Sequence, residues 1–245
     1  MKLQHYLGGL EGLGPVSTET RVFVEQWEKR IFGIHTAMMA LSTQIPLPTT
    51  PSSFRTVWTW ADLRKGAESL NPFDYFRFRY YEKWLGGISS YFISHAYITQ
   101  AELDALTEEY YADPSKPLPS DGAAAIDARI VQYLVEGDSP KRGTVVNHAF
   151  AAGDAVQVCD VPTVEHTRLP GYLRNRTGTV ETVYEGAYTY LCDTGPDGIG
   201  AAMPVYCVRF DPVTIWPGNT EPNFAIYADL YAHYIAAPAA AQQSA

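Results

Sequence analysis

The stretch DPSKPLPSDG, residues 113–122, divides the chain into two halves with different patterns. Its three prolines and final glycine are typical of an extended connector. Before the connector, apolar residues recur at helical spacing. Beyond residue 150 they occur in short β-branched or aromatic runs. We therefore expect an α+β chain, mainly α in its N-terminal half and all-β in its C-terminal half.

The half before the connector predicts successive helices over residues 17–112. Helix starts are indicated by Thr59 with Asp62, by Asn71-Pro72 and by TQAE at 99–102. The apolar run from Phe73 to Tyr97 predicts one long buried helix in which Gly86-Gly87 is a candidate bend. The first helix starts from Thr18, and its apolar residues recur every three or four positions: Phe23, Trp27, Ile31, Ile34, Met38 and Leu41.

The half after the connector predicts strands. Gly, Pro and Asp turns separate five short segments: DAVQVCD (154–160), TGTVETVY (177–184), YTYLC (188–192), PVYCVRF (204–210) and NFAIYAD (223–229). This spacing favours a small Src-homology-3-like antiparallel β-barrel over residues 150–236.

The remaining segments complete the expected domain organisation. Residues 1–16 are rich in glycine and predict an extended arm, whereas residues 237–245 predict a disordered tail. Between the two halves, residues 113–149 form a connector with a short helix over 123–135.

Composition excludes several classes of protein. The chain carries 18 Lys and Arg against 27 Asp and Glu, a net charge of −9, which argues against a general nucleic-acid binder. No apolar run is long enough to span a membrane, and the N-terminus does not match a signal peptide. We expect a cytoplasmic protein.

Common catalytic and metal-binding motifs are absent from the sequence. Cys159, Cys192 and Cys207 are isolated from one another, and no histidine has a second histidine four residues away. Neither a G-x-S-x-G elbow nor a phosphate-binding loop occurs. These patterns predict that the chain is not a complete enzyme by itself and binds no metal ion.

Arginines are the better candidates for chemistry. The segment EHTRLPGYLRNRTG, residues 165–178, holds Arg168, Arg174 and Arg176, and Arg64 lies in the helix that Thr59 begins. A guanidinium binds an oxyanion through two parallel hydrogen bonds, which a lysine does not reproduce. Plain surface arginines remain the alternative. The dense aromatic residues from Tyr75 to Trp84 are either core or part of a pocket or subunit interface.

The order of several motifs resembles the β subunit of nitrile hydratase from residue 1 to about 236: MKLQHYLGGLEGLGPV, HTRLPGYLRNRTG, PVYCVRF and IYADLYAHYI. This resemblance implies an obligate α subunit that holds non-haem iron(III) or cobalt(III) in a C-x-x-C-S-C motif with two oxidised cysteines. The complex would be an αβ heterodimer or (αβ)₂ heterotetramer that hydrates small nitriles to amides. No metal would be bound by this chain.

The resemblance also implies roles for particular residues. Arg64, within ADLRKGAESL, and Arg168, within HTRLP, would donate hydrogen bonds to the oxidised cysteines across the subunit interface. Oxyanions in such a low-dielectric interface need paired donors. The wall of the substrate pocket on this side would include Phe32, Trp60, Leu63, Tyr80 and Trp84.

Two alternatives stay open. A subunit of the related thiocyanate hydrolase is one, and a non-enzymatic adaptor with a binding barrel is the other, because a fold does not fix a function. Arg174 and Arg176 support the adjoining strand, bind carboxylates of the partner or are surface charge.

Overall fold

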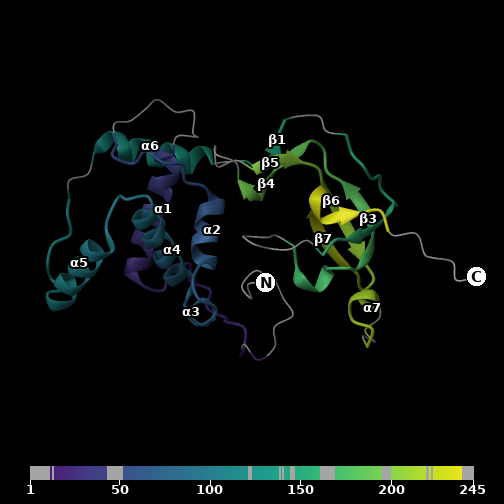
Figure 1. Ribbon diagram of the computed structural model, residues 1–245, viewed down its shortest axis with the longest axis horizontal. Helices are drawn as coiled ribbons and strands as arrows, with labels where there is room; N and C mark the ends of the chain where they lie inside the picture. Colours follow the sequence, from purple (N-terminus) through teal and green to yellow (C-terminus); the bar gives the residue numbers. More distant parts are fainter. Residues whose placement is uncertain are drawn as a thin grey trace, which may run out of the picture. The chain divides into compact units, whose positions relative to one another are not determined.

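The computed structural model describes residues 12, 14–42, 52–120, 123–137, 139, 141–143, 147–160, 169–194, 200–218, 221 and 223–238. The chain forms two compact units that divide between Asp138 and Ser139. Helices make up the first unit and strands dominate the second (Figure 1). The expected α+β class, with its helical N-terminal half and antiparallel C-terminal half, is confirmed.

The first unit contains six described helices: α1 (Gln26–Leu41), α2 (Trp60–Glu68), α3 (Pro72–Arg77), α4 (Tyr80–Ser94), α5 (Gln100–Ala112) and α6 (Ala124–Glu136). Three of their starts confirm the sequence signals. Thr59 and Asp62 form a reciprocal capping box at α2, and Thr99 and Glu102 form another at α5. Asn71 caps α3, which begins with a proline.

Two helix boundaries differ from expectation. The first helix begins at Gln26 and not near residue 18, because Glu25 is extended and its amide donates to Glu28 Oε2 at 3.1 Å. The single helix expected from Phe73 to Tyr97 is wrong. A capping box at Arg79, whose amide donates to Glu82 Oε2 at 2.7 Å, begins a new helix there.

Gly87 lies at a close contact between α2 and α4. A Cβ atom on Gly87 would lie 2.7 Å from the carbonyl carbon of Gly66 and 2.8 Å from the amide nitrogen of Ala67. The backbones of α2 and α4 therefore touch at Gly66 and Gly87, which have no side chains. Helix α4 continues without a break through Gly86-Gly87, so the glycines permit packing and do not end the helix.

The core of the helical unit is aromatic and aliphatic. Its buried apolar side chains come from α1, α2, α4 and the segment before α2: Ile31, Met38, Met39, Trp58, Leu63, Tyr81, Trp84 and Ile88. Helix α6 packs on α1, and the buried Arg129 of α6 donates a hydrogen bond to the Ala40 carbonyl. The expected boundaries of the connector stay predictions.

The second unit contains two antiparallel sheets. The larger has the order β7-β6-β3-β2-β8 and is built from β2 (Ala155–Val158), β3 (Thr177–Val183), β6 (Val205–Phe210), β7 (Ile226–Tyr231) and β8 (Ile235–Ala236). The smaller has the order β1-β4-β5, from β1 (Lys141–Arg142), β4 (Ala187–Thr194) and β5 (Gly200–Met203). Three short helical turns accompany them: η2 (Gly171–Leu173), α7 (Pro212–Ile215) and η3 (Ala232–Tyr234).

Each of the five predicted segments contains a strand, but they do not form one barrel. The strand over 187–194 pairs with β1 and β5, while the two-residue β8 takes the edge beside β2. Within the described strands, β7 and β8 do not pair, so the larger sheet is an open half-barrel. The Src-homology-3-like barrel is not confirmed.

None of the helices in the described part of the chain combines the length and apolar character needed to cross a membrane.

Candidate functional site

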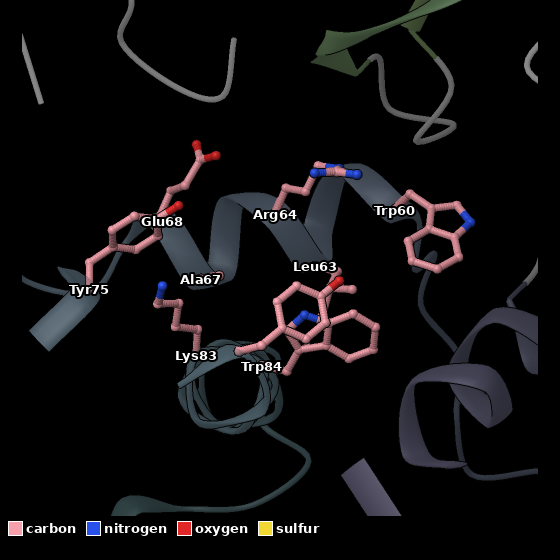
Figure 2. Close-up of a pocket in the computed structure, with 9 residues that line it drawn as sticks. Trp60, Leu63, Arg64, Ala67, Glu68, Tyr75, Lys83 and Trp84 are labelled. Atoms are coloured by element: carbon pink, nitrogen blue, oxygen red, sulfur yellow. The ribbon is translucent and has the colours of Figure 1, made fainter. Parts of the chain in front are cut away.

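A pocket of about 130 Å³ lies between α2, α3 and α4 in the helical unit (Figure 2). Helix α2 lines it with residues at one-face spacing: Trp60, Leu63, Arg64, Ala67 and Glu68. Tyr75 of α3 and Tyr80, Lys83 and Trp84 of α4 complete the lining. Figure 2 shows α4 end-on beside α2, so one face of each helix meets the other across the pocket.

One end of the pocket is aromatic. The Trp84 ring lies 5.2 Å from that of Tyr80 and 6.4 Å from that of Trp60, measured between centroids. Leu63 and Trp84 are buried, whereas Trp60 and Tyr80 are partly open to solvent. This end can therefore hold a small apolar group and keep a face open to a partner or substrate.

His35 of α1 packs behind these aromatic residues. Its ring centroid lies 4.4 Å from that of Trp60 and 5.0 Å from that of Trp84. Trp58 Nε1 donates to His35 Nδ1 at 3.0 Å, which places the proton of the neutral imidazole on Nε2. Burial lowers the pKa of His35 to about 4. His35 is thus a neutral, structural contact of the pocket walls near neutral pH.

The other end of the pocket carries charge. Lys83 Nζ lies 4.5 Å from the centroid of the Tyr75 ring, a cation–π contact, and burial lowers the pKa of this lysine. Glu68 is buried and Arg64 is exposed on the same face of α2. The pKa of Tyr75 is raised by burial first and by Glu68 second, and Arg64 opposes the rise.

The structure brings together five of the seven site residues expected from the sequence: Arg64, Trp60, Leu63, Tyr80 and Trp84. Phe32 does not line this pocket; its ring packs edge-to-face on Phe23 at 5.7 Å. Arg168 lies outside the described residues.

Four lining residues were not named as site residues: Ala67, Glu68, Tyr75 and Lys83. Of these, Tyr75 belongs to the aromatic run for which a pocket was one of the alternatives. Helical spacing could have found two of them. Glu68 is four residues after Arg64, and Lys83 is three after Tyr80, so each shares a helix face with a residue already singled out.

Arg174 supports the β unit. It is buried, and its Nη1 donates to Asp160 Oδ1 at 2.9 Å, which ties the turn after η2 to the end of β2. The Arg176 carbonyl accepts from the Val158 amide at 2.8 Å in the same region. For Arg174, support of the adjoining strand is therefore the role seen among the described residues.

The described residues do not fit a metal site. Across the described ranges, no three His, Cys, Asp or Glu side chains gather closely enough to hold an ion. Cys159 and Cys207 are free and partly buried. Burial, followed by Asp229, raises the pKa of the Cys207 thiol, which disfavours the thiolate that ligates metals.

Two family models match this chain in succession: nitrile hydratase beta subunit, N-terminal, over residues 1–128, and nitrile hydratase beta subunit, C-terminal, over residues 139–237. The chain belongs to the nitrile hydratase beta-subunit family. The resemblance of its motifs to that family is thereby confirmed.

Named relatives of this family are similar over nearly the whole chain. The low-molecular weight cobalt-containing nitrile hydratase subunit beta of Rhodococcus rhodochrous is 31% identical and covers 94% of this chain and 97% of its own. The cobalt-containing nitrile hydratase subunit beta of Pseudonocardia thermophila is 30% identical, with coverage of 94% and 93%.

Among solved structures, the recombinant apo-enzyme of thiocyanate hydrolase (SCNase) from Thiobacillus thioparus matches with 21% identity and a TM-score of 0.36. The match covers 50% of this chain and 99% of the other.

Proposed function

We propose that this chain is the beta subunit of a nitrile hydratase, a hydro-lyase that acts only in complex with a metal-bearing alpha subunit. The observation that carries the proposal is the pocket in which Arg64 meets Trp60, Leu63, Tyr80 and Trp84. Membership in a beta-subunit family implies the alpha-subunit partner. The names of two relatives support cobalt over iron as the ion in that partner.

Arg64 is the donor that this site offers to oxidised cysteines of the partner. It is an exposed residue of α2 and borders the pocket (Figure 2). A guanidinium presents several N–H groups in a fixed plane and can bind two anionic oxygens at once. Arg168 takes the matching role on the motif HTRLP.

The aromatic end of the pocket binds the hydrocarbon part of the nitrile. Leu63 and Trp84 are already buried, so they present a fixed apolar wall. Covering apolar surface there contributes about 25 cal/mol per Å². The ion of the partner would supply Lewis acidity toward the nitrile, while this chain orients the substrate and limits access of bulk water.

Arg64→Lys tests the role of Arg64. We expect kcat toward nitriles to fall by about 100-fold, as when one preorganised donor to a reacting oxyanion is removed. Complex formation, measured by size-exclusion chromatography, and metal content should persist. Arg55→Lys is the matched control, because Arg55 is exposed and does not line the pocket. Full activity of Arg64→Lys would refute the assignment.

The same complex distinguishes the alternative substrate. Assays with nitriles and with thiocyanate should give turnover of nitriles. Hydrolysis of thiocyanate without hydration of any nitrile would instead assign the chain to a thiocyanate hydrolase.

The Src-homology-3-like character of the larger sheet also stays a proposal. Two features support it: the order β7-β6-β3-β2-β8 and the η3 turn that joins β7 to β8.

A further inference from the structure

Lys83 is a second cation in the wall of the pocket, which also contains Arg64 and the carboxylate of Glu68. Its ammonium packs over the Tyr75 ring, and its stem lies on α4 one turn before Gly87, at the contact with α2. The side chain is only partly exposed. Burial that lowers the pKa of Lys83 means that its charge is incompletely hydrated.

No carboxylate pairs with this ammonium in the described part of the chain. The ion pairs of Arg77 and Arg79 nearby do not include Lys83, whose Nζ packs over the Tyr75 ring. In Figure 2 the Glu68 carboxylate points away from the Lys83 ammonium. A partly desolvated cation without a carboxylate gains free energy from an anion that enters the pocket.

The position of Lys83 sets it apart from the aromatic end. Trp60 and Ala67 are seven residues apart on α2, which corresponds to about 10 Å along the helix axis. Figure 2 shows Trp60 at one end of this face and Tyr75 with Lys83 at the other, with Arg64 and Leu63 between them. A ligand that reaches from Arg64 to Lys83 therefore needs a polar group separated from its reacting end by a short chain.

We propose that Lys83 makes this end of the pocket a carboxylate-recognition site, so that the enzyme prefers short-chain cyano-carboxylates to neutral nitriles of similar length. The inference rests on the proposed function and names its substrate class. The nitrile lies toward Arg64 and the aromatic residues, and the carboxylate accepts hydrogen bonds from Lys83 Nζ. The Tyr75 ring holds the ammonium in place from its other side.

The experiment compares cyanobutanoate with its methyl ester in the intact complex of alpha and beta subunits. The two substrates share a chain and a nitrile and differ in charge. We expect kcat/KM to be higher for the acid in the unmodified enzyme. In Lys83→Met the ratio of acid to ester should fall by about 10- to 100-fold, the range for loss of one hydrogen bond to a charged group.

Lys83→Arg and Lys29→Met are the companion variants. Lys83→Arg keeps the charge and should retain a preference for the acid. Lys29 is exposed on α1 and does not line the pocket, so Lys29→Met should leave the ratio unchanged. If the Lys83→Met complex hydrates the ester, it is folded. If Lys83→Met does not assemble with the alpha subunit, Lys83→Gln takes its place in the comparison.

Three results would overturn the inference. One is an unmodified enzyme that favours the ester. Another is an acid preference that survives Lys83→Met, which would place recognition on Arg64 or on the partner. The third, hydration of neither substrate nor of any simple nitrile, would sink the proposed function itself and the inference with it.

Discussion

His35 is a buried histidine that packs against Trp60 and Trp84 at the aromatic end of the pocket. Because burial lowers its pKa to about 4, the folded state keeps it neutral at a pH where the unfolded chain already binds a proton. The stabilising contribution is complete above the unfolded value of roughly 6.5 and declines as the pH falls toward 4. The chain should therefore become easier to unfold over this window.

The prediction is a loss of up to about 1.4 kcal/mol of unfolding free energy per pH unit between those two values. Denaturant unfolding of the complex at several pH values measures this slope. His35→Gln should flatten it, because glutamine can accept the Trp58 hydrogen bond without titrating. His95→Gln is the control, since His95 is exposed at the end of α4. An unchanged slope in His35→Gln would disprove the assignment.

At the scale of elements, the contact between α2 and α4 depends on Gly87. A methyl group there would lie 2.7 Å from backbone of Gly66, and backbone cannot move aside as a flexible side chain can. Gly87→Ala should destabilise the helical unit by about 1–3 kcal/mol through overpacking. Because the pocket lies between these helices, the KM for nitriles should rise as well.

Gly86→Ala provides the matched control one residue away. Its added Cβ would meet only the end of the Leu70 side chain, at 3.0 Å. Alanine gains up to about 1 kcal/mol over glycine in a helix interior, so this variant should match or exceed the original stability. Thermal unfolding of both variants compares them directly. Equal changes in stability for Gly86→Ala and Gly87→Ala would mean that helix propensity, and not the contact between α2 and α4, determines the effect of alanine at these positions.

The elements also show what the sequence can predict. Thr59, Asn71 and Thr99 mark helix starts correctly because capping is a local interaction of neighbouring residues. The restart at Arg79 was missed because an Arg and a Glu three residues apart also form favourable pairs within a continuous helix. Pairing of the strand over 187–194 with β1 and β5 joins residues far apart in sequence, which alternation does not encode.

For the pocket, too, the sequence predicted some of the lining residues and missed others. Motif position identified Arg64, Trp60 and three neighbouring pocket residues, which the structure brings together. Lys83 lies outside the quoted motifs, and Glu68 lies within ADLRKGAESL but was given no role there. Charged residues at helical spacing are usually solvated. Only the packing of α2 against α4 turns those two faces toward one cavity.

At the scale of the whole molecule, the structure and the family divide the chain in the same region. The described residues from 139 onward belong to one compact unit, and the C-terminal family match covers residues 139–237. Each unit leaves large apolar side chains open to solvent, including Phe73, which is 87% exposed, and Val135, which is 80% exposed, in the helical unit and Trp216 in the other. Singly exposed apolar residues are normal on a protein surface, so the expectation of a covering partner rests on the family match.

The last prediction separates an obligate subunit from an independent adaptor. Expressed alone, this chain should be recovered mostly as insoluble or aggregated protein, because an obligate subunit loses the stabilisation that its partner provides. Co-expression with an alpha subunit of the same family should give a soluble complex, coloured if that subunit holds the proposed ion. Size-exclusion chromatography and metal analysis of the two preparations make the comparison. A monodisperse, colourless and thermally stable single chain would instead favour the adaptor, because a surface that is stable in water needs no partner to cover it.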